Sequence, residues 1–324
     1  MSEMAPAAAA APRSATRFDR FLFDWFPAES LGALRLYFGI GLALYVLTQY
    51  PQLFILDAFG PQFHYTVPIW YFHALGIERN VPWLAWPVAL ATLAACLCFA
   101  FGKWTRPAIV AIIIGIFILK GMRDSFSGDV HHREVPIFAL LILFFFSKCG
   151  RTFGIDARRK GWPAIAAWES SWPIRAMQVY IAMFYFWALM AKLRVSGLFW
   201  FEHGGRIQET LIARALRDGF AADGHVVNLS LAWELSQKPD LVFVFGAGVF
   251  LFELFFPLIL FVRDWRLRLV MLIGATIFHF ANFLLMNVQF YFYPFVFVCF
   301  FDMARVHGWL KRRLRLGPEV AATG

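Results

Sequence analysis

Long apolar runs separated by short polar segments make up most of the chain. A helix that crosses a membrane needs about 20 predominantly apolar residues, and most of the runs have that length. The runs predicted to be such helices are 31–48, 82–101, 106–121, 134–147, 173–192, 241–262, 267–285 and 287–303. The third and fourth runs are short, so a tilted or re-entrant hairpin is the alternative there. The pattern predicts an all-α polytopic integral membrane protein with about eight transmembrane helices.

The segment 193–240 has a different periodicity. Its apolar and charged residues alternate with the spacing of a two-faced helix. The apolar positions are Ile207, Leu211, Ile212 and Leu216, and the charged ones are Arg206, Glu209, Arg214 and Arg217. We therefore expect an amphipathic helix that faces outward, lies at the membrane interface and covers the bundle.

The two ends of the chain differ from the apolar centre. Residues 1–20 are rich in Ala and Pro and are predicted to be a disordered cytosolic tail. Residues 21–305 form the predicted transmembrane domain. Residues 306–324 are predicted to be a basic cytosolic tail.

Composition agrees with a membrane protein and excludes an ordinary soluble one. Hydrophobic residues make up 60% of the chain and charged residues 16%, against roughly 45–50% and about 25% in soluble domains. The four cysteines, Cys96, Cys98, Cys149 and Cys299, lie in or beside apolar runs, so we expect free thiols and no disulfide framework. The residue pattern predicts no metal site and no nucleic-acid partner.

The net charge of +9 indicates orientation rather than nucleic-acid binding, because Lys and Arg gather at the ends of the runs. One set of alternate loops carries 19 of these residues and the other set carries 9. By the positive-inside rule both termini are cytosolic, and 49–82, 120–133 and 193–240 face outward. We expect a multi-pass protein of the bacterial inner membrane or plasma membrane. Arg35, near the cytosolic end of the first run, is expected to snorkel.

Polar residues inside apolar runs are costly in a membrane and therefore informative. Gln178, Tyr185 and Lys192 are seven residues apart and form one stripe along 173–192. Lys192 ends the stripe at the outer side. It either snorkels to the interface or serves as a partly buried general base.

A second stripe lies on 267–285, where Thr276, His279 and Asn282 step by three along one face, and Gln289 continues it. This stripe is either a hydrogen-bond network between helices or part of a site. Glu253 lies within 241–262 and must be paired or protonated there. Its candidate partners are Lys192, Arg35 or a neighbouring hydroxyl.

Two adjacent histidines, His131 and His132, precede 134–147. They lack the ligand spacing of a zinc site. Two interpretations remain: one of the two histidines borders an outer pocket, or both are ordinary loop residues.

Three segments in this order resemble the horizontally transferred transmembrane (HTTM) module, the membrane part of the vitamin K-dependent gamma-carboxylase family. The segments are HHREVPIFALLILFFFSKCGRTFGIDARRK, AKLRVSGLFWFEHGGRI and FHFANFLLMNVQFYFYPFVF. The resemblance covers roughly residues 20–305 and implies a membrane fold that binds vitamin K hydroquinone. In that family oxygen converts the deprotonated hydroquinone into a strong base, glutamate loses a γ-proton and gains carbon dioxide, and the quinone leaves as its epoxide.

The resemblance also implies roles for residues of this chain. Lys192 matches the lysine that deprotonates the hydroquinone, and His279 is the second catalytic candidate. The remaining implied site residues are Trp200, Gly204, Asn282, Glu253 and either His131 or His132, to which the polar stripe adds Tyr185 and Gln178. Ala191 and Arg194 depart from the family, which has Lys and Asp at those places.

Two classes of function follow from these residues. The first is a carboxylase-like enzyme that binds a reduced lipid quinone and carries out quinone-dependent carboxylation or oxidation at the outer face. The second is a non-enzymatic membrane protein that binds lipid or quinone or helps a secreted peptide to mature. Membrane lipid, quinone and a secreted peptide or protein are the expected partners. A transporter is the weaker third option, because paired broken helices at the midplane are not evident.

Overall fold

A computed structural model describes residues 16–23, 26–50, 67–77, 82–127, 133–202, 205–219, 229–286, 288, 290 and 292–314. These residues form helices, turns and irregular segments, with no strand among them. Five of the described helices are long and apolar enough to cross a membrane. The chain divides into two compact units, Met1–Met177 with Phe301–Gly324 and Gln178–Phe300. The prediction of an all-α fold is confirmed for the described residues, and five of their helices have the length and composition of membrane spans. The count of about eight spans and the placement of the termini stay predictions.

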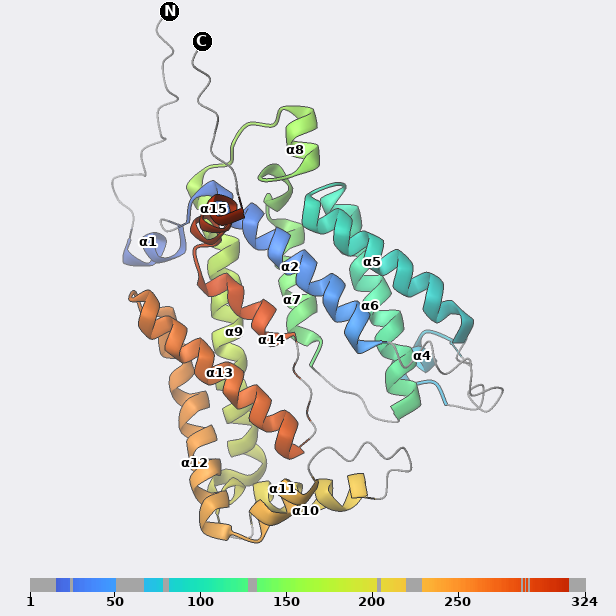
Figure 1. The fold of residues 1–324 in the computed structure, drawn as a ribbon, viewed down its shortest axis with the longest axis vertical. Coiled ribbons are helices and arrows are strands. Elements are labelled where there is room, and N and C mark those ends of the chain that lie inside the picture. Colours follow the sequence, from blue (N-terminus) through green and yellow to red (C-terminus); the bar gives the residue numbers. More distant parts are fainter. Residues whose placement is uncertain are drawn as a thin grey trace, which may run out of the picture. The chain divides into compact units, whose positions relative to one another are not determined.

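The first unit, Met1–Met177 with Phe301–Gly324, is built around four neighbouring helices, α2, α5, α6 and α7 (Figure 1). Its helices are α1 (Arg17–Phe23), α2 (Ala28–Gln49), α4 (Trp70–Ala74), η2 (Pro82–Leu84), α5 (Ala85–Phe101), α6 (Thr105–Ser127), α7 (Val135–Phe146), η3 (Cys149–Arg151), α8 (Ile155–Lys160), the start of α9 (Ala167–Ser196) and α15 (Met303–Leu314). Small residues let α2 and α5 approach closely: a Cβ on Gly39 would lie 2.7 Å from the Cα of Ala100. Close approach through small residues is typical of helix packing in membranes.

Arg35 of α2 is fully buried, so the expectation that it snorkels to the interface is wrong. Its guanidinium donates to four backbone carbonyls, those of Ala100, Cys149, Thr152 and Phe153. Five N–H donors in a fixed fork suit Arg for several acceptors at once. Arg35 therefore ties the turn after α7 to the ends of α2 and α5.

Helix α6 continues to Ser127, beyond the predicted end of the run 106–121. Lys120 and Arg123, which were assigned to an outward loop, lie within this helix and are buried. Lys120 pairs with Asp124, one turn further along, and Arg123 Nη2 lies 2.7 Å from Glu134 Oε1. Pairing offsets the desolvation cost of burying these charges, so the helix can extend past the apolar run.

The start of the predicted basic tail 306–324 is helical. Helix α15 packs against α2, and Tyr37 Oη lies 3.4 Å from His307 Nδ1. Ser30 Oγ also donates to Asp302 Oδ1 at 2.8 Å, just before α15 begins. The last turn of α15 carries Lys311, Arg312 and Arg313. Cations are stabilised there by the negative end of the helix dipole. The predicted disordered segment 1–20 lies mostly outside the described residues.

The second unit, Gln178–Phe300, contains the rest of α9 and two further long helices that run beside it (Figure 1). Its other elements are η4 (Gly197–Trp200), α10 (Arg206–Gly219), α11 (Leu229–Ser236), α12 (Pro239–Phe255), η5 (Phe256–Leu260), α13 (Trp265–Met286), α14 (Tyr293–Val296) and η6 (Phe297–Phe300). The predicted helices 173–192, 241–262 and 267–285 correspond to α9, α12 with η5, and α13.

The predicted eighth helix, 287–303, is not a single helix. The described residues there form the four-residue α14 followed by the 3₁₀ helix η6. Pro294 lies in the first turn of α14, where its missing N–H costs nothing. A proline in the middle of a longer helix would remove a backbone hydrogen bond, which explains a helix start rather than a continuous span.

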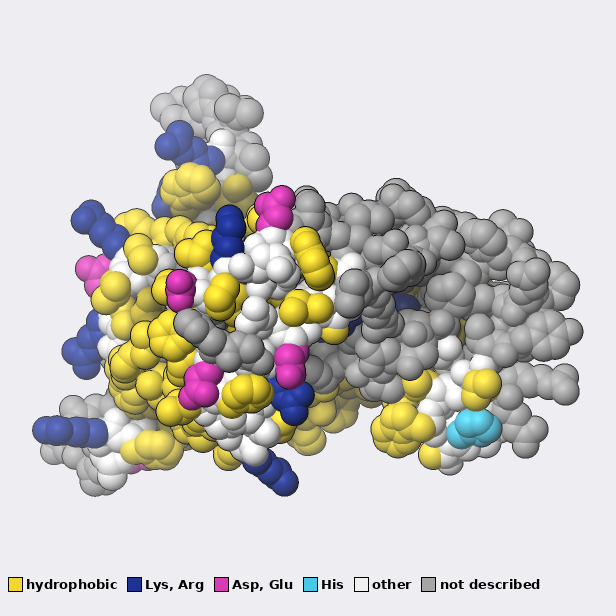
Figure 2. Space-filling view, turned by 90° about the horizontal axis from the view of Figure 1, so that it is seen from below, with side chains coloured by type: hydrophobic (Ala, Val, Ile, Leu, Met, Phe, Trp, Pro, Cys, Tyr) yellow, Lys and Arg dark blue, Asp and Glu magenta, His cyan; other side chains and the backbone are white. Residues whose placement is uncertain are grey.

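The amphipathic helix predicted within 193–240 is α10, and this prediction is confirmed. Ile207 and Leu211 are buried and pack with Ala232 of α11, Val242 of α12 and Leu285 of α13. Helices α10 and α11 thus cover one end of α12 and α13 (Figure 1). Seen from that end, basic and acidic side chains lie among hydrophobic ones (Figure 2). Its outward orientation stays a prediction.

Candidate functional site

Lys192 and Glu253 form an ion pair between α9 and α12. Lys192 Nζ donates to both carboxylate oxygens of Glu253, at 2.6 and 2.8 Å. The Glu253 side chain is 3% exposed and that of Lys192 is 22% exposed. Of the three partners considered for Glu253, the structure selects Lys192. The two hydrogen bonds to one carboxylate make Lys192 and Glu253 a single ion-paired unit that joins α9 to α12.

Trp200 completes this end of α9. The Lys192 ammonium lies 5.1 Å from the centroid of the Trp200 ring, within the range of a cation–π contact. Trp200 is the last residue of the short helix η4, which follows α9 directly. Helix η4 begins at Gly197, which has a positive φ of 58°. The reversal at Gly197 is what folds Trp200 back over the lysine that precedes it by eight residues.

Tyr185 and His279 form the second polar contact of this unit. The Tyr185 hydroxyl lies 2.6 Å from His279 Nε2, and both side chains are buried. Tyr185 stands seven residues before Lys192 on α9, which places the two contacts about 10 Å apart along the helix. His279 comes from the middle of α13, so three helices contribute to the two contacts.

Aromatic rings surround the His279 imidazole. Ring centroids lie within about 4 to 6 Å of it on several sides, and the rings come from α9, α13, α14, η6 and the residues just before α14. The contacts are to Tyr185 at 5.7 Å, Phe278 at 5.2 Å, Phe290 at 4.7 Å, Tyr293 at 4.2 Å and Phe297 at 6.2 Å. Tyr185 itself packs on Phe256 at 4.2 Å. The imidazole is thus held within an aromatic shell.

The other ring nitrogen of His279 is the unusual atom of this site. Nδ1 is buried and has no hydrogen-bond partner among the described residues, while the whole residue is only 7% exposed. An unsatisfied buried polar group costs roughly 1–3 kcal/mol, so such an atom calls for an explanation. A ligand atom that meets Nδ1 would supply one.

The remaining members of the two predicted stripes separate. Gln178 is buried, and its Nε2 donates to the carbonyl of Cys299 at 2.6 Å, which is a structural role. Thr276 is exposed and its hydroxyl donates to the carbonyl of Leu272 within α13. The stripe on α13 is therefore not buried along its length, because only His279 of the three points into the core.

Four further residues belong to the predicted site. Asn282 is half-buried, one turn after His279, and its backbone carbonyl accepts from the N–H of Val288 at 3.3 Å. His131, His132 and Gly204 lie outside the described residues. Lys192, Glu253, Trp200, Tyr185, His279, Gln178 and Asn282 all belong to the unit Gln178–Phe300.

The first unit holds a buried charged cluster that the sequence reasoning did not single out. Glu134 Oε1 accepts from Tyr45 at 2.7 Å, from Arg123 at 2.7 Å and from Arg133 at 3.1 Å. The signal that could have found it is Lys120 and Asp124 at i and i+4 at the end of an apolar run. Most of its polar atoms find protein partners, which is typical of a structural network.

Among the described residues, the cysteines form no disulfide, and the cysteine, histidine and acidic side chains form no metal-binding group. All four cysteines are free, as expected. In that part of the chain no group of three or more His, Cys, Asp or Glu side chains could hold a metal ion.

No known protein family, no curated protein and no solved structure matches this chain. The resemblance to the HTTM module therefore stays a prediction, carried by the three segments quoted above. The residues of the second unit have to support a function by their own geometry.

Proposed function

We propose that this integral membrane protein binds a reduced lipid quinone among α9, α12 and α13 and carries out quinone-dependent carboxylation or oxidation there. The observation that carries the proposal is the buried Nδ1 of His279, which has no hydrogen-bond partner among the described residues and lies within an aromatic shell. A quinone head group is flat, apolar on its faces and polar at two oxygens.

The residues present fit such a group. Ligand sites are lined mostly by apolar and aromatic side chains, with a few polar atoms that fix orientation. The rings of Phe290 and Tyr293 beside His279 supply apolar surface, and Nδ1 supplies a polar atom for a ligand oxygen. The Tyr185 hydroxyl engages Nε2 and thereby fixes the orientation of the imidazole ring.

The Lys192–Glu253 pair is the proton acceptor in this proposal. A hydroquinone, when bound, supplies two electrons and acidic hydroxyls. Removal of such a proton requires a nearby base. The Glu253 carboxylate takes up the proton in this proposal, and the Lys192 ammonium keeps that carboxylate ionised until then. Trp200 packs against the ammonium through its cation–π contact. Asn282, one turn from His279, is the additional amide donor for a ligand oxygen.

A non-enzymatic function is the second candidate, and one observation favours it. Both Glu253 oxygens are satisfied by the same ammonium, and the carboxylate is almost fully buried. Such a pair can hold two helices together without taking part in a reaction. The protein would then bind lipid or quinone, or help a secreted peptide to mature, without turnover.

The two candidates are separated by assays of purified protein in lipid nanodiscs with vitamin K hydroquinone. In air-saturated buffer, with molecular oxygen as the oxidant, we expect saturable binding and formation of oxidised product, either quinone or epoxide, above the uncatalysed rate. His279→Phe keeps the ring contacts and removes both nitrogens, so binding should weaken by about tenfold. Lys192→Met should abolish turnover while binding is largely kept.

The matched control is Arg194→Met, which removes an exposed positive charge two residues further along α9. It should leave binding and turnover unchanged. Saturable binding without turnover in the wild type would favour the non-enzymatic candidate. No saturable binding, or a His279→Phe protein that binds as the wild type does, would overturn the proposed site.

A further inference from the structure

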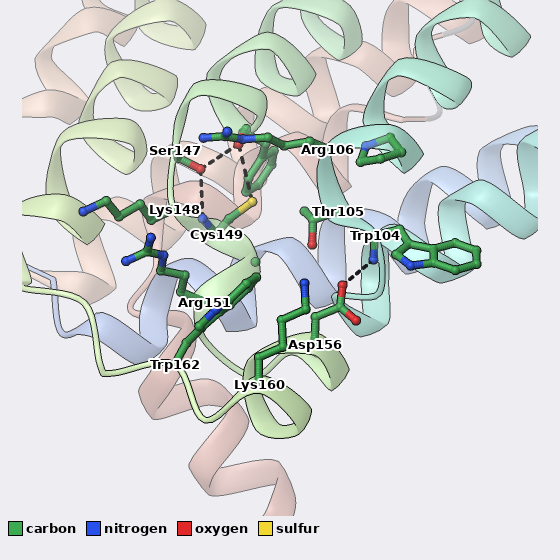
Figure 3. A pocket seen from close by; sticks show the side chains of 13 residues that line it. Trp104, Thr105, Arg106, Ser147, Lys148, Cys149, Arg151, Asp156, Lys160 and Trp162 are labelled. Carbon is green, nitrogen blue, oxygen red and sulfur yellow. Dashed lines mark hydrogen bonds between the residues drawn. The ribbon is translucent and has the colours of Figure 1, made fainter.

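A pocket with a basic lining lies in the first unit. None of its lining residues belongs to the proposed quinone site. The pocket has a volume of about 450 Å³ and lies where α6 begins, α7 ends and η3 and α8 follow (Figure 3). Sites for small ligands commonly have volumes of about 300–1,000 Å³. We refer to it as the basic pocket, defined by Arg106, Lys148, Arg151, Lys160 and the groups between them.

The four cations of the basic pocket come from separate segments of the chain. Arg106 lies in α6, and Lys160 ends α8. Lys148 lies just before η3, and Arg151 is the last residue of η3. Asp156 is the acidic residue of the lining, and Lys148 pairs with Glu169 outside it. Four positive charges against these two negative ones leave a net charge of +2. This charge suits a phosphate group, which carries one to about two negative charges.

The carboxylate of Asp156 is already engaged. Its Oδ2 accepts from the backbone N–H of Trp104 at 2.7 Å (Figure 3). In the other direction, the backbone N–H of Asp156 donates to the carbonyl of Gly102 at 3.2 Å. Asp156 therefore fixes α8 to the turn before α6. Lys148 is paired with Glu169, whereas Arg106, Arg151 and Lys160 form no ion pair among the described residues.

One indole holds two of the cations in place. Lys160 Nζ lies 4.8 Å and Arg151 Cζ lies 5.8 Å from the ring centroid of Trp162. Both distances are within the range of cation–π contacts, which cost the cation none of its charge. Trp162 thus brings cations from η3 and α8 together at one side of the basic pocket.

The backbone beneath the basic pocket is firmly held. Buried Arg35 donates to the carbonyls of Cys149, Thr152 and Phe153, so the turn that carries Arg151 is fixed from below. At Gly150 a Cβ would lie 2.7 Å from Thr105 Oγ1, so η3 packs directly on the start of α6. A fixed backbone leaves only the side chains to be ordered when the cations bind an anion.

The lining favours binding rather than catalysis. Cys149 is its one thiol, and burial raises the pKa of this thiol, so it stays protonated and unreactive near neutral pH. The acidic residue of the lining is bound to backbone, as described above. Cations without a nucleophile or a free base are suited to holding an anion.

The surroundings indicate that the anion carries apolar chains. Helix α6 begins at Thr105 and is one of the five helices that could cross a membrane. Beside the basic pocket, Trp104 is 64% exposed and Phe146 is 68% exposed, and Val110 and Ile142 are exposed further along α6 and α7. Tryptophan and cations at the end of a spanning helix mark the depth of lipid head groups. Basic pockets at this depth bind anionic lipid head groups.

We propose that the basic pocket binds the phosphate of an anionic phospholipid, with Arg106, Arg151 and Lys160 on the phosphate and the acyl chains along α6 and α7. The predicted orientation places this pocket in the cytosolic leaflet, which is rich in anionic lipid. Free inorganic phosphate shares the recognising chemistry but lacks the chains that the exposed apolar side chains would cover.

The test measures binding of a short-chain fluorescent phosphatidylglycerol to the detergent-solubilised full chain, beside phosphatidylcholine with the same chains. We expect phosphatidylglycerol to bind about tenfold more tightly. The double variant Arg106→Gln/Lys160→Gln should lose that preference. Arg158→Gln/Arg159→Gln is the matched control, because it removes the same charge from exposed positions of α8 outside the basic pocket. It should bind as the wild type does.

Two further measurements separate the remaining outcomes. The charge-preserving variant Arg106→Lys/Lys160→Arg should retain the preference, which shows that a loss in the Gln variant reflects charge and not misfolding. Inorganic phosphate should displace the lipid only weakly. Equal binding of the two lipids, or equal effects of the Gln variant and its control, would overturn the proposal. Displacement by micromolar phosphate would overturn the assignment to a lipid.

Discussion

Removal of either partner of the Lys192–Glu253 pair should have unequal costs, and the structure gives the reason. Lys192→Met leaves the Glu253 carboxylate, with its side chain 3% exposed, without the ammonium that satisfies both oxygens. Glu253→Gln leaves an ammonium that is 22% exposed and still 5.1 Å from the Trp200 ring. The lysine therefore keeps water and an aromatic partner, whereas the carboxylate keeps neither.

The magnitudes follow from these environments. Breaking a buried ion pair costs about 3–5 kcal/mol in soluble proteins, and polar contacts in membranes are worth less than that limit. We expect Lys192→Met to lower the free energy of unfolding by about 3 kcal/mol and Glu253→Gln by about 1 kcal/mol. The double variant should lose about 2 kcal/mol, so the coupling energy is about 2 kcal/mol.

The assay is reversible unfolding in mixed micelles of mild detergent and dodecyl sulfate, followed by circular dichroism. Arg194→Met serves as the control, because it removes an exposed charge from the same helix and should change the free energy by less than about 0.5 kcal/mol. Equal costs for the two single variants would refute the argument from exposure. A coupling energy below about 0.5 kcal/mol would refute the pair itself.

Four more outcomes follow, three from the first unit and one from α12. Arg35→Met should lower the free energy of unfolding by about 3 kcal/mol or more in the same assay, because four buried carbonyls lose their donor; a loss below about 1 kcal/mol would contradict this. Gly39→Ala should cost about 1–3 kcal/mol, since its Cβ would lie 2.7 Å from Ala100. By contrast, Gly248→Ala, whose Cβ would meet nothing within 4 Å, should be neutral or stabilising. Cys149 should resist maleimide in the folded protein, because burial raises the pKa of its thiol, and rapid labelling detected by mass spectrometry would refute this.

The helices of this protein could be predicted well from the sequence because each is recorded in a local pattern. The apolar runs predicted α2, α5, α12 with η5, and α13 to within a few residues, and the 3.6-residue period predicted α10. The run 287–303 failed because hydropathy alone ignores Pro294, whose effect on the helix start is a backbone property.

The partners of buried polar groups could not be predicted, because they depend on residues distant in sequence. Glu253 had three candidate partners, and the one selected is 61 residues away. Arg35 is held by backbone carbonyls, which every residue has and which no sequence pattern marks. The basic pocket likewise brings together Arg106 of α6 and Lys160 of α8, which are distant in the sequence, so its residues are recognisable as a group only in the fold.

The central claim, that a reduced quinone binds beside His279 and Lys192, is tested most directly by a cryo-EM map. Cryo-electron microscopy of the full chain in nanodiscs loaded with vitamin K hydroquinone, beside the same nanodiscs without it, would give that map. The account predicts additional flat density with one oxygen within hydrogen-bonding distance of His279 Nδ1, present only in the loaded sample. Identical maps around His279, or ligand density confined to another part of the protein, would contradict it.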